Sequence, residues 1–151
     1  MQAGHNPRVP TRGVKAKGVA RALPKPRVKR KFIKSRALIT LDGSLVVHIG
    51  IRTRNPENGG RMHWGEKATH KEKFEKAVRD AARPLAVTSV TFIRWSPGVG
   101  FDDDSLPVSF KWFRDAACKW LGLPNDSPTC GVAFKYEQHK QPEYGITLRF
   151  R

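Results

Sequence analysis

The chain has 151 residues, of which 29 are Lys or Arg and 13 are Asp or Glu, and its net charge is +16 at pH 7. This length suits a single domain. The longest apolar run, residues 44–51, is too short to span a bilayer, and no apolar segment typical of a secretory signal follows the basic start. Two cysteines are too few for a disulfide-built secreted domain. We therefore expect a cytoplasmic protein with reduced cysteines, no membrane partner and a polyanionic partner, of which nucleic acid is the commonest.

The positive charge is concentrated at the start of the chain. Residues 1–36 hold 12 basic residues and no acid, so residues 37–151 carry 17 basic residues against 13 acids, a net charge of +4. Prolines and low hydrophobicity predict that residues 1–36 form a disordered arm, which can neutralise phosphates without reading sequence. The alternative is a solvated tail that only maintains solubility. The candidate nucleic-acid-binding residues of the arm are Lys25, Arg27, Lys29, Arg30 and Lys31.

After this arm the pattern becomes that of a folded domain, which begins with a hairpin. The β-forming runs 37–41 and 44–51 flank Asp42–Gly43, and this dipeptide between two such runs is the strongest short-range hairpin signal. Charged residues then surround an apolar face from about Glu66 to Arg83, which predicts a helix that Pro84 follows. The residues on that face are Phe74, Val78 and Ala81.

The next part of the chain predicts a strand and a second helix. Residues 87–95 alternate as a strand does, and residues 96–100 form a loop. A helix follows with Ser105 as its N-cap and Pro107 in its first turn, and Gly122 suits its C-terminal cap. The single apolar stripe of this helix comprises Leu106, Phe110, Phe113, Ala117 and Leu121.

Two further strands complete the predicted fold. Apolar residues alternate over residues 132–136 and 144–150, with a polar loop between them. The chain therefore predicts an α+β fold over residues 37–151, with a mixed β-sheet of about five strands and two main helices, preceded by the basic arm.

Three consecutive acids, Asp102, Asp103 and Asp104, are unusual in so basic a chain. In an extended segment the side chains of Asp102 and Asp104 would point to one side and that of Asp103 to the other. Two carboxylates on one side, after a glycine-rich turn, predict a site for Mg²⁺ or Mn²⁺, because both ions prefer hard oxygen ligands. The alternative is that Asp104 only stabilises the positive end of the helix dipole while Asp102 is solvated.

Further charged side chains follow the acids. Lys111 lies seven positions after Asp104, on the same face of a continuous helix, where its cation can balance carboxylates or contact a phosphate. The alternative for Lys111 is an ordinary surface pair with Asp115. Asp126, in the loop after the helix, offers either another metal-binding carboxylate or only a turn-forming side chain.

A second group of candidate nucleic-acid-binding residues lies at the start of the first helix. Arg61, His63 and Trp64 place a cation, an imidazole and an indole close together, and Lys67 follows them. These side chains can stack on a nucleic-acid strand or steer it, whereas Trp64 can equally cover the core. The histidines and cysteines show no spacing that is typical of a zinc site.

Several of these residues together resemble one known family of nucleases. The matching motifs are Asp102-x-Asp104-Ser-Leu, Lys111-x-x-x-Asp115, Trp120-Leu-Gly-Leu, Asn125-Asp126-Ser-Pro and Tyr136-Glu-Gln138, with Arg61-x-His63-Trp64 before them. Over about residues 46–150 the chain resembles the RusA-like Holliday-junction resolvases, and it is most similar to their phage and prophage variety. Residues 1–36 lie outside the resemblance.

The resemblance implies a homodimeric, Mg²⁺-dependent endonuclease of DNA recombination and repair, in a bacterial or phage-infected cell, that nicks two strands of a four-way DNA junction. By position, Asp102, Asp104 and Asp126 would be catalytic metal ligands, and Lys111 would be a catalytic cation near the phosphate. Metal-activated water would attack the phosphodiester in line. Two symmetric cuts need two sites related by a twofold axis, which fits a homodimer.

The chain departs from the family at three places, and a second function stays open. Ser105 stands where the family usually has Asn, and the loop at Asn125–Asp126 retains one of two usual acids. Lys111 also lies farther from the acids than in the shorter members of the family, which implies extra residues near the start of the helix. The alternative function is a non-catalytic nucleic-acid-binding protein, for example a degenerate nuclease or a packaging or ribosome-associated factor. Such a protein would bind through its basic arm without a divalent metal.

Overall fold

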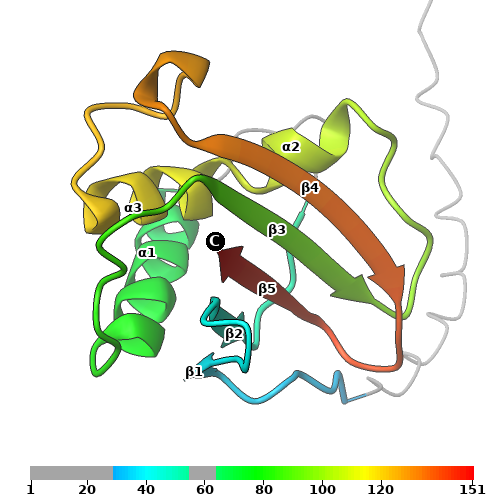
Figure 1. Ribbon diagram of the computed structural model, residues 1–151. Helices are drawn as coiled ribbons and strands as arrows, with labels where there is room; N and C mark the ends of the chain where they lie inside the picture. Colours follow the sequence, from blue (N-terminus) through cyan, green and yellow to red (C-terminus); the bar gives the residue numbers. More distant parts are fainter. Residues whose placement is uncertain (1–28, 55–63) are drawn as a thin grey trace, which may run out of the picture.

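The computed structural model describes residues 29–54 and 64–151, and for Trp64 and Pro128 it describes the backbone alone. These residues form the predicted α+β fold, in which helices cover one face of a five-stranded mixed sheet (Figure 1). In chain order the elements are β1 (Arg36–Ile39), β2 (Leu45–Ile49), α1 (Trp64–Val78), β3 (Ser89–Ser96), α2 (Ser105–Ser109), α3 (Lys111–Leu121), the 3₁₀ turn η1 (Pro128–Cys130), β4 (Ala133–Lys140) and β5 (Gly145–Phe150).

The strands of the described sheet follow the order β1-β2-β5-β3-β4. Every neighbouring pair is antiparallel except β3 and β4, which run parallel. A parallel pair needs a crossover connection, and α2 and α3 lie in the segment that joins the end of β3 to the start of β4. Both strands therefore end at the same edge of the sheet, where β3 leads into the loop that carries the three acids (Figure 1).

The hairpin and the first helix are confirmed, with a change in the bounds of the helix. β1 and β2 pair as the predicted hairpin, and Gly43 in its turn has φ 78°, a left-handed conformation that glycine adopts without strain. The predicted first helix ends at Val78 instead of Arg83. The amide of Ala81 bonds the Val78 carbonyl (3.0 Å) and closes the last turn there.

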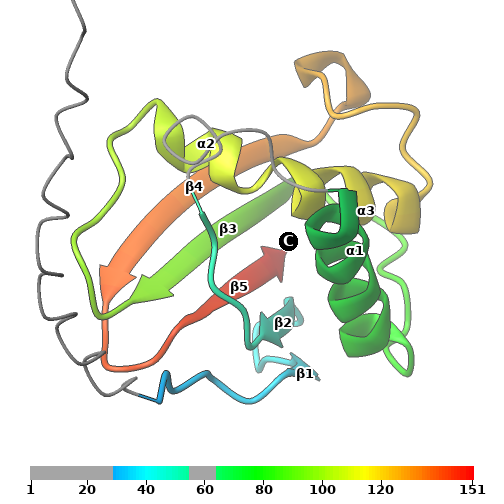
Figure 2. The ribbon, with the colours of Figure 1, turned by 180° about the vertical axis from the view of Figure 1, so that it is seen from behind.

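The core lies between the sheet and the helices, which occupy the same face of the sheet in both views (Figures 1 and 2). Phe74 of α1, Phe110 between α2 and α3, and Phe113 of α3 are almost completely buried. The ring of Phe110 lies 5.4 Å from that of Phe92 in β3. Because burying one such side chain contributes about 1.5–3 kcal/mol, these rings hold the crossover helices on the sheet.

The second predicted helix is in fact two helices, α2 and α3, so the prediction of one continuous helix is wrong. The amide of Phe110 bonds the carbonyl of Pro107 (3.2 Å), three residues back, and this tighter turn separates the two helices. Ser105 is the first helical residue and not the N-cap, and Asp104 occupies the cap position. At the other end, Gly122 has φ 76° and closes α3 as predicted.

The folded domain begins before the predicted end of the arm. The amide of Tyr144 donates to the Lys31 carbonyl (2.9 Å), and the amide of Ile33 donates to the Tyr144 carbonyl (3.0 Å). Lys31 and Ile33 are therefore part of the folded domain, because their backbone groups pair with Tyr144 just before β5, and Arg36 already belongs to β1, so the boundary predicted after residue 36 lies too late. Residues 1–28, which include most of the predicted arm, lie outside the described residues.

We predict that Gly50→Ala detaches this first segment from the sheet. A Cβ at Gly50 would overlap the carbonyl oxygen of Ile33, which cannot move without shifting the backbone. Overpacking of this kind costs about 1–3 kcal/mol, so we expect the free energy of unfolding in urea to fall by that amount. The control is Gly98→Ala, where the nearest atom, Ser96 Oγ, is 3.7 Å from the added Cβ. Equal stabilities of the two variants would contradict this account.

Candidate functional site

The three acids lie in the segment that joins β3 to α2, and residues 101–104 of this segment form the acid loop. Gln138 of β4 holds Phe101, the first residue of the acid loop. The Phe101 amide donates to Gln138 Oε1 (2.8 Å), and Gln138 Nε2 donates to the Phe101 carbonyl oxygen (2.6 Å). Gly100 permits this close approach, since a Cβ there would lie 2.9 Å from the Gln138 amide group. One side chain thus satisfies both backbone groups of the residue before Asp102.

Asp102 and Asp104 have different local roles at the start of α2. The Ser105 amide donates to Asp102 Oδ1 (2.8 Å), and hydrogen bonds from the Ser105 side chain and amide lower the pKa of Asp102 below its usual value. Asp104 has helical backbone angles (φ −77°, ψ −39°), and its side chain makes no capping bond. The segment therefore turns and is not extended, so the alternation argument for these two carboxylates does not apply. The alternative, in which Asp104 favours the positive end of the helix dipole and Asp102 is solvated, stays open, because Asp102 is exposed as well as bonded to the helix.

The carboxylates of residues 102–104 are exposed. Within the described residues, no Lys, Arg or His forms an ion pair with any of them. Exposed carboxylates without a cationic partner are free to bind a hydrated divalent cation, although the net charge of +16 opposes its approach. Asp102 and Asp104 offer carboxylate oxygens of the kind that hydrated Mg²⁺ or Mn²⁺ prefers.

Arg94 of β3 contacts the same loop and is the register partner of Gln138 in the β3–β4 pair. It is only 6% exposed, its Nε donates to Thr53 Oγ1 (3.0 Å), and its Cζ lies 3.9 Å from the centre of the Phe101 ring. Burial lowers the pKa of this guanidinium, which still stays charged at neutral pH. The loop is thus held through its backbone by Gln138 and through an aromatic ring by Arg94.

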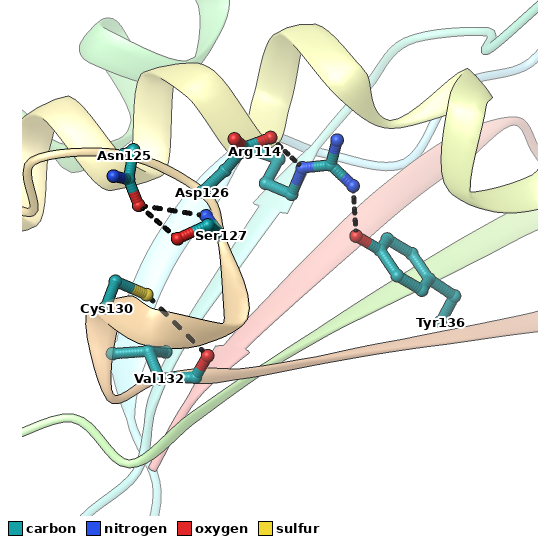
Figure 3. A network of polar contacts seen from close by, with 7 residues as sticks. All are labelled: Arg114, Asn125, Asp126, Ser127, Cys130, Val132 and Tyr136. Atoms are coloured by element: carbon teal, nitrogen blue, oxygen red, sulfur yellow. Dashed lines mark hydrogen bonds and ion pairs between the residues drawn. The ribbon is translucent and has the colours of Figure 1, made fainter.

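Asp126 lies beyond the end of α3 and is engaged by Arg114 (Figure 3). Arg114 Nε donates to Asp126 Oδ2 (2.7 Å), and Arg114 Nη1 donates to the Tyr136 hydroxyl oxygen (2.6 Å). Burial, followed by the negative charge of Asp126, raises the pKa of Asp115. Asp126 therefore belongs to a charge cluster with Arg114 and Asp115 on the exposed side of α3.

The structure does not bring the three predicted metal ligands together. In the described part of the chain, no group of three or more His, Cys, Asp or Glu side chains is arranged to hold a metal ion. The acid loop therefore supplies Asp102 and Asp104, whereas the ion pair with Arg114 keeps Asp126 in a separate cluster.

Lys111 and Lys67 meet at the ring of Trp112. Their Nζ atoms lie 5.5 Å and 4.2 Å from the ring centre, so exposed cations from α3 and α1 flank one indole. Because α2 and α3 are separate helices, Lys111 does not share a continuous helical face with Asp104, and that part of the prediction is wrong. Among the described residues, Lys111 also forms no ion pair with Asp115.

Several predicted nucleic-acid-binding residues lie outside the described residues. They are Lys25, Arg27, Arg61 and His63. Trp64 is the first residue of α1, and nothing is described of its side chain. Lys29, Arg30 and Lys31 are described and exposed, just before β1, so their charges are accessible to a polyanion.

The two residues that hold the acid loop were not identified as site residues from the sequence. Arg94 carried a usable signal, because it is the single charged residue within the predicted strand 87–95. Gln138 carried none beyond the family resemblance, because its partner Phe101 lies far away in the sequence. The two cysteines, as expected, are free thiols.

No known family model matches this chain, and no curated protein matches it at a significant level. None of the described helices is long and apolar enough to cross a membrane.

We predict that Gln138→Ala loosens the acid loop. The change removes two hydrogen bonds and leaves the amide and carbonyl of Phe101 without partners, so the free energy of unfolding should fall by about 1–3 kcal/mol. Hydrogen exchange at the Phe101 amide should accelerate as well. The matched control is Gln141→Ala, because the Gln141 side chain makes no hydrogen bond within the described residues. Similar losses in both variants would show that Gln138 does not clamp the loop.

Proposed function

We propose that this protein is a Mg²⁺-dependent endonuclease that resolves four-way DNA junctions by hydrolysing paired phosphodiesters, as a homodimer. One observation carries the proposal: Asp102 and Asp104 lie exposed and without an ion-pair partner among the described residues, in a loop that Gln138 and α2 hold at both ends. A strongly basic protein with an exposed acidic loop combines attraction for DNA with oxygen ligands for a divalent cation. The motif resemblance to RusA-like resolvases supports the choice of reaction and substrate.

Each residue of this set has a distinct task in the proposed reaction. Asp102 and Asp104 would hold the metal, and Mg²⁺ or Mn²⁺ when bound would supply Lewis acidity and an activated water. Lys111, exposed at the start of α3, would contact the DNA backbone. Asp126 is not included among the ligands, because Arg114 engages its carboxylate.

The homodimer is part of the proposal for a geometric reason. Resolving a four-way junction requires two cuts placed symmetrically, and one chain offers a single acid loop. Two chains related by a twofold axis would present two such loops to the two strands. The exposed cations at Lys29, Arg30 and Lys31 would add attraction for the phosphate backbone.

We predict that Asp104→Asn abolishes Mg²⁺-dependent cleavage while DNA binding is kept or becomes tighter. The cleavage rate should fall by roughly 100-fold or more, because one of the two proposed metal ligands is lost and with it the charge stabilisation that the metal would supply, and binding should gain from removing a negative charge near phosphate. The measurement is cleavage of a labelled four-way junction and of linear duplex with the same sequence, with and without Mg²⁺.

The control for this variant is Asp80→Asn, which removes the same charge from an exposed site just after α1. It should cleave the junction like the wild type. Junction cleavage by Asp104→Asn at the wild-type rate would refute the assignment of Asp104. Tight junction binding by the wild type without cleavage in either metal condition would refute the proposed activity.

A non-catalytic nucleic-acid-binding protein is the second candidate, and the concentration of charge before the fold favours it. We predict that removing residues 1–28 weakens DNA binding and its salt dependence. This deletion stops short of Lys31, whose backbone pairs with Tyr144, so the fold should be kept. It removes seven basic residues, and the slope of log K against log salt should fall by up to about 6 if all seven contact phosphates.

Fluorescence anisotropy over a KCl series, without divalent metal, measures both quantities. An unchanged slope would exclude the arm as the DNA-binding element. If binding collapses while the wild type shows no metal-dependent cleavage, the binding function replaces the nuclease.

A further inference from the structure

A cavity of about 420 Å³ opens at the carboxyl ends of the parallel strands β3 and β4. Its lining includes residues 96–100, Arg94 of β3, Gln138 of β4, and Lys140 at the end of β4. Ligands in open α/β sheets are commonly bound outside the carboxyl ends of parallel strands, where loops diverge. The acid loop begins directly after the cavity-lining Gly100.

Arg94 is a buried cation that lacks an anionic partner within the described residues. It is 6% exposed, it donates one hydrogen bond to the Thr53 hydroxyl and lies over the ring of Phe101, and its charged neighbour Arg52 is another cation. A guanidinium has five N–H donors, and Thr53 accepts from the Nε donor alone. Burying a charge is costly unless it is paired, so arginines in such positions usually face a carboxylate. Here Arg94 is one of the residues that line the cavity, and no carboxylate of the described residues forms an ion pair with it.

Arg114, in contrast to Arg94, has an anionic partner among the described residues. It donates to the Asp126 carboxylate at 2.7 Å and to the Tyr136 hydroxyl at 2.6 Å, although it is less buried than Arg94. The contrast indicates that Arg94 is placed to meet an anion that the described residues do not supply.

The composition of the cavity indicates which anion. The planar fork of arginine matches two oxygens of a phosphate, and Lys140 adds a second, exposed cation at the rim. None of the residues that line the cavity is acidic, so an anion in it would meet no carboxylate of the lining. We propose that this cavity binds a phosphate group of the nucleic-acid backbone, beside the Asp102–Asp104 loop.

This proposal deepens the proposed function and depends on it only for the source of the phosphate. Arg94 also lies against Phe101, whose backbone Gln138 clamps, so the phosphate site and the acid loop have a common support. A phosphate held in the cavity would fix the register of the backbone, so that a neighbouring phosphodiester faces the carboxylates.

The test is binding of a fluorescein-labelled four-way junction in EDTA, over a KCl series, to the wild type and three variants. Arg94→Met keeps an unbranched side chain against Phe101 but removes the charge, and Lys140→Gln removes the exposed cation. We expect Arg94→Met to raise Kd by roughly tenfold and to lower the salt slope by about 1, with a smaller change for Lys140→Gln. Lys76→Gln, an exposed site on α1 outside the cavity, is the control and should change Kd by less than about twofold.

EDTA separates this proposal from the nuclease proposal, because binding is measured whether or not the protein cleaves DNA. Unchanged Kd and salt slope in both Arg94→Met and Lys140→Gln would overturn the phosphate site. Circular dichroism establishes whether Arg94→Met folds. If it does not fold, an unchanged Kd and salt slope in Lys140→Gln would by itself overturn the phosphate site.

Inorganic phosphate, compared with chloride at equal ionic strength, distinguishes the two sources of the ligand. Competition of phosphate with the junction in the wild type, lost in Arg94→Met, supports the backbone phosphate. Thermal stabilisation by phosphate that Arg94→Met abolishes, together with unchanged junction binding, would overturn the nucleic-acid source.

Discussion

The parallel pairing of β3 with β4 is the constraint on which the candidate site depends. Its register aligns Arg94 with Gln138 and ends with Ser96 beside Lys140. Parallel strands cannot be joined by a tight turn, so the chain leaves β3 through a long loop and crosses over through α2 and α3. The same pairing therefore forms the cavity, places the acid loop at its edge, and supplies the glutamine that holds that loop.

The charged side chains near the site lie in three different environments, which the net charge of +16 does not reveal. Asp126 and Arg114 satisfy each other on α3, whereas the acids of the loop are exposed and Arg94 is buried. An ion pair on a protein surface has little functional meaning, since it contributes at most about 1 kcal/mol and needs no ligand. Charges of opposite sign without an ion-pair partner among the described residues, at one end of the parallel strand pair, are more informative, because both remain available to a ligand.

The parts of the fold that could be predicted are those that depend on local chemistry. Asp42–Gly43 determines its turn through backbone conformation, and Gly122 ends α3 for the same reason. The break at Phe110 could not be predicted, because the spacing of apolar residues also fits one continuous helix, and the tight turn is visible only in the backbone bonds. The pairing of the Lys31 backbone with Tyr144 could not be predicted either, because the segment is highly charged and the two residues lie far apart in the chain.

The candidate site was only partly predictable for a related reason. A cluster of acidic residues is easy to recognise in a sequence, and the structure leaves the carboxylates of Asp102 and Asp104 exposed. Asp126 is separated from them by its ion pair with Arg114. The side chain of Arg114 reaches from α3 to Tyr136 of β4, and no rule of residue spacing predicts that contact. Gln138 and Arg94 were missed because their importance comes from strand register, which a single sequence does not specify.

A site with two carboxylates has a consequence for how metal and DNA would bind together. Mg²⁺ favours six oxygen ligands and is commonly held by one or two carboxylates, with waters and substrate phosphates completing the shell. On the proposed function, Asp102 and Asp104 alone would bind the ion weakly, and a DNA phosphate would complete its shell. Binding free energies are reciprocal, so metal would strengthen DNA binding by the same factor as DNA strengthens metal binding. A buried Arg94 that anchors the backbone nearby would increase that coupling, because it presents the next phosphate to the acid loop already ordered.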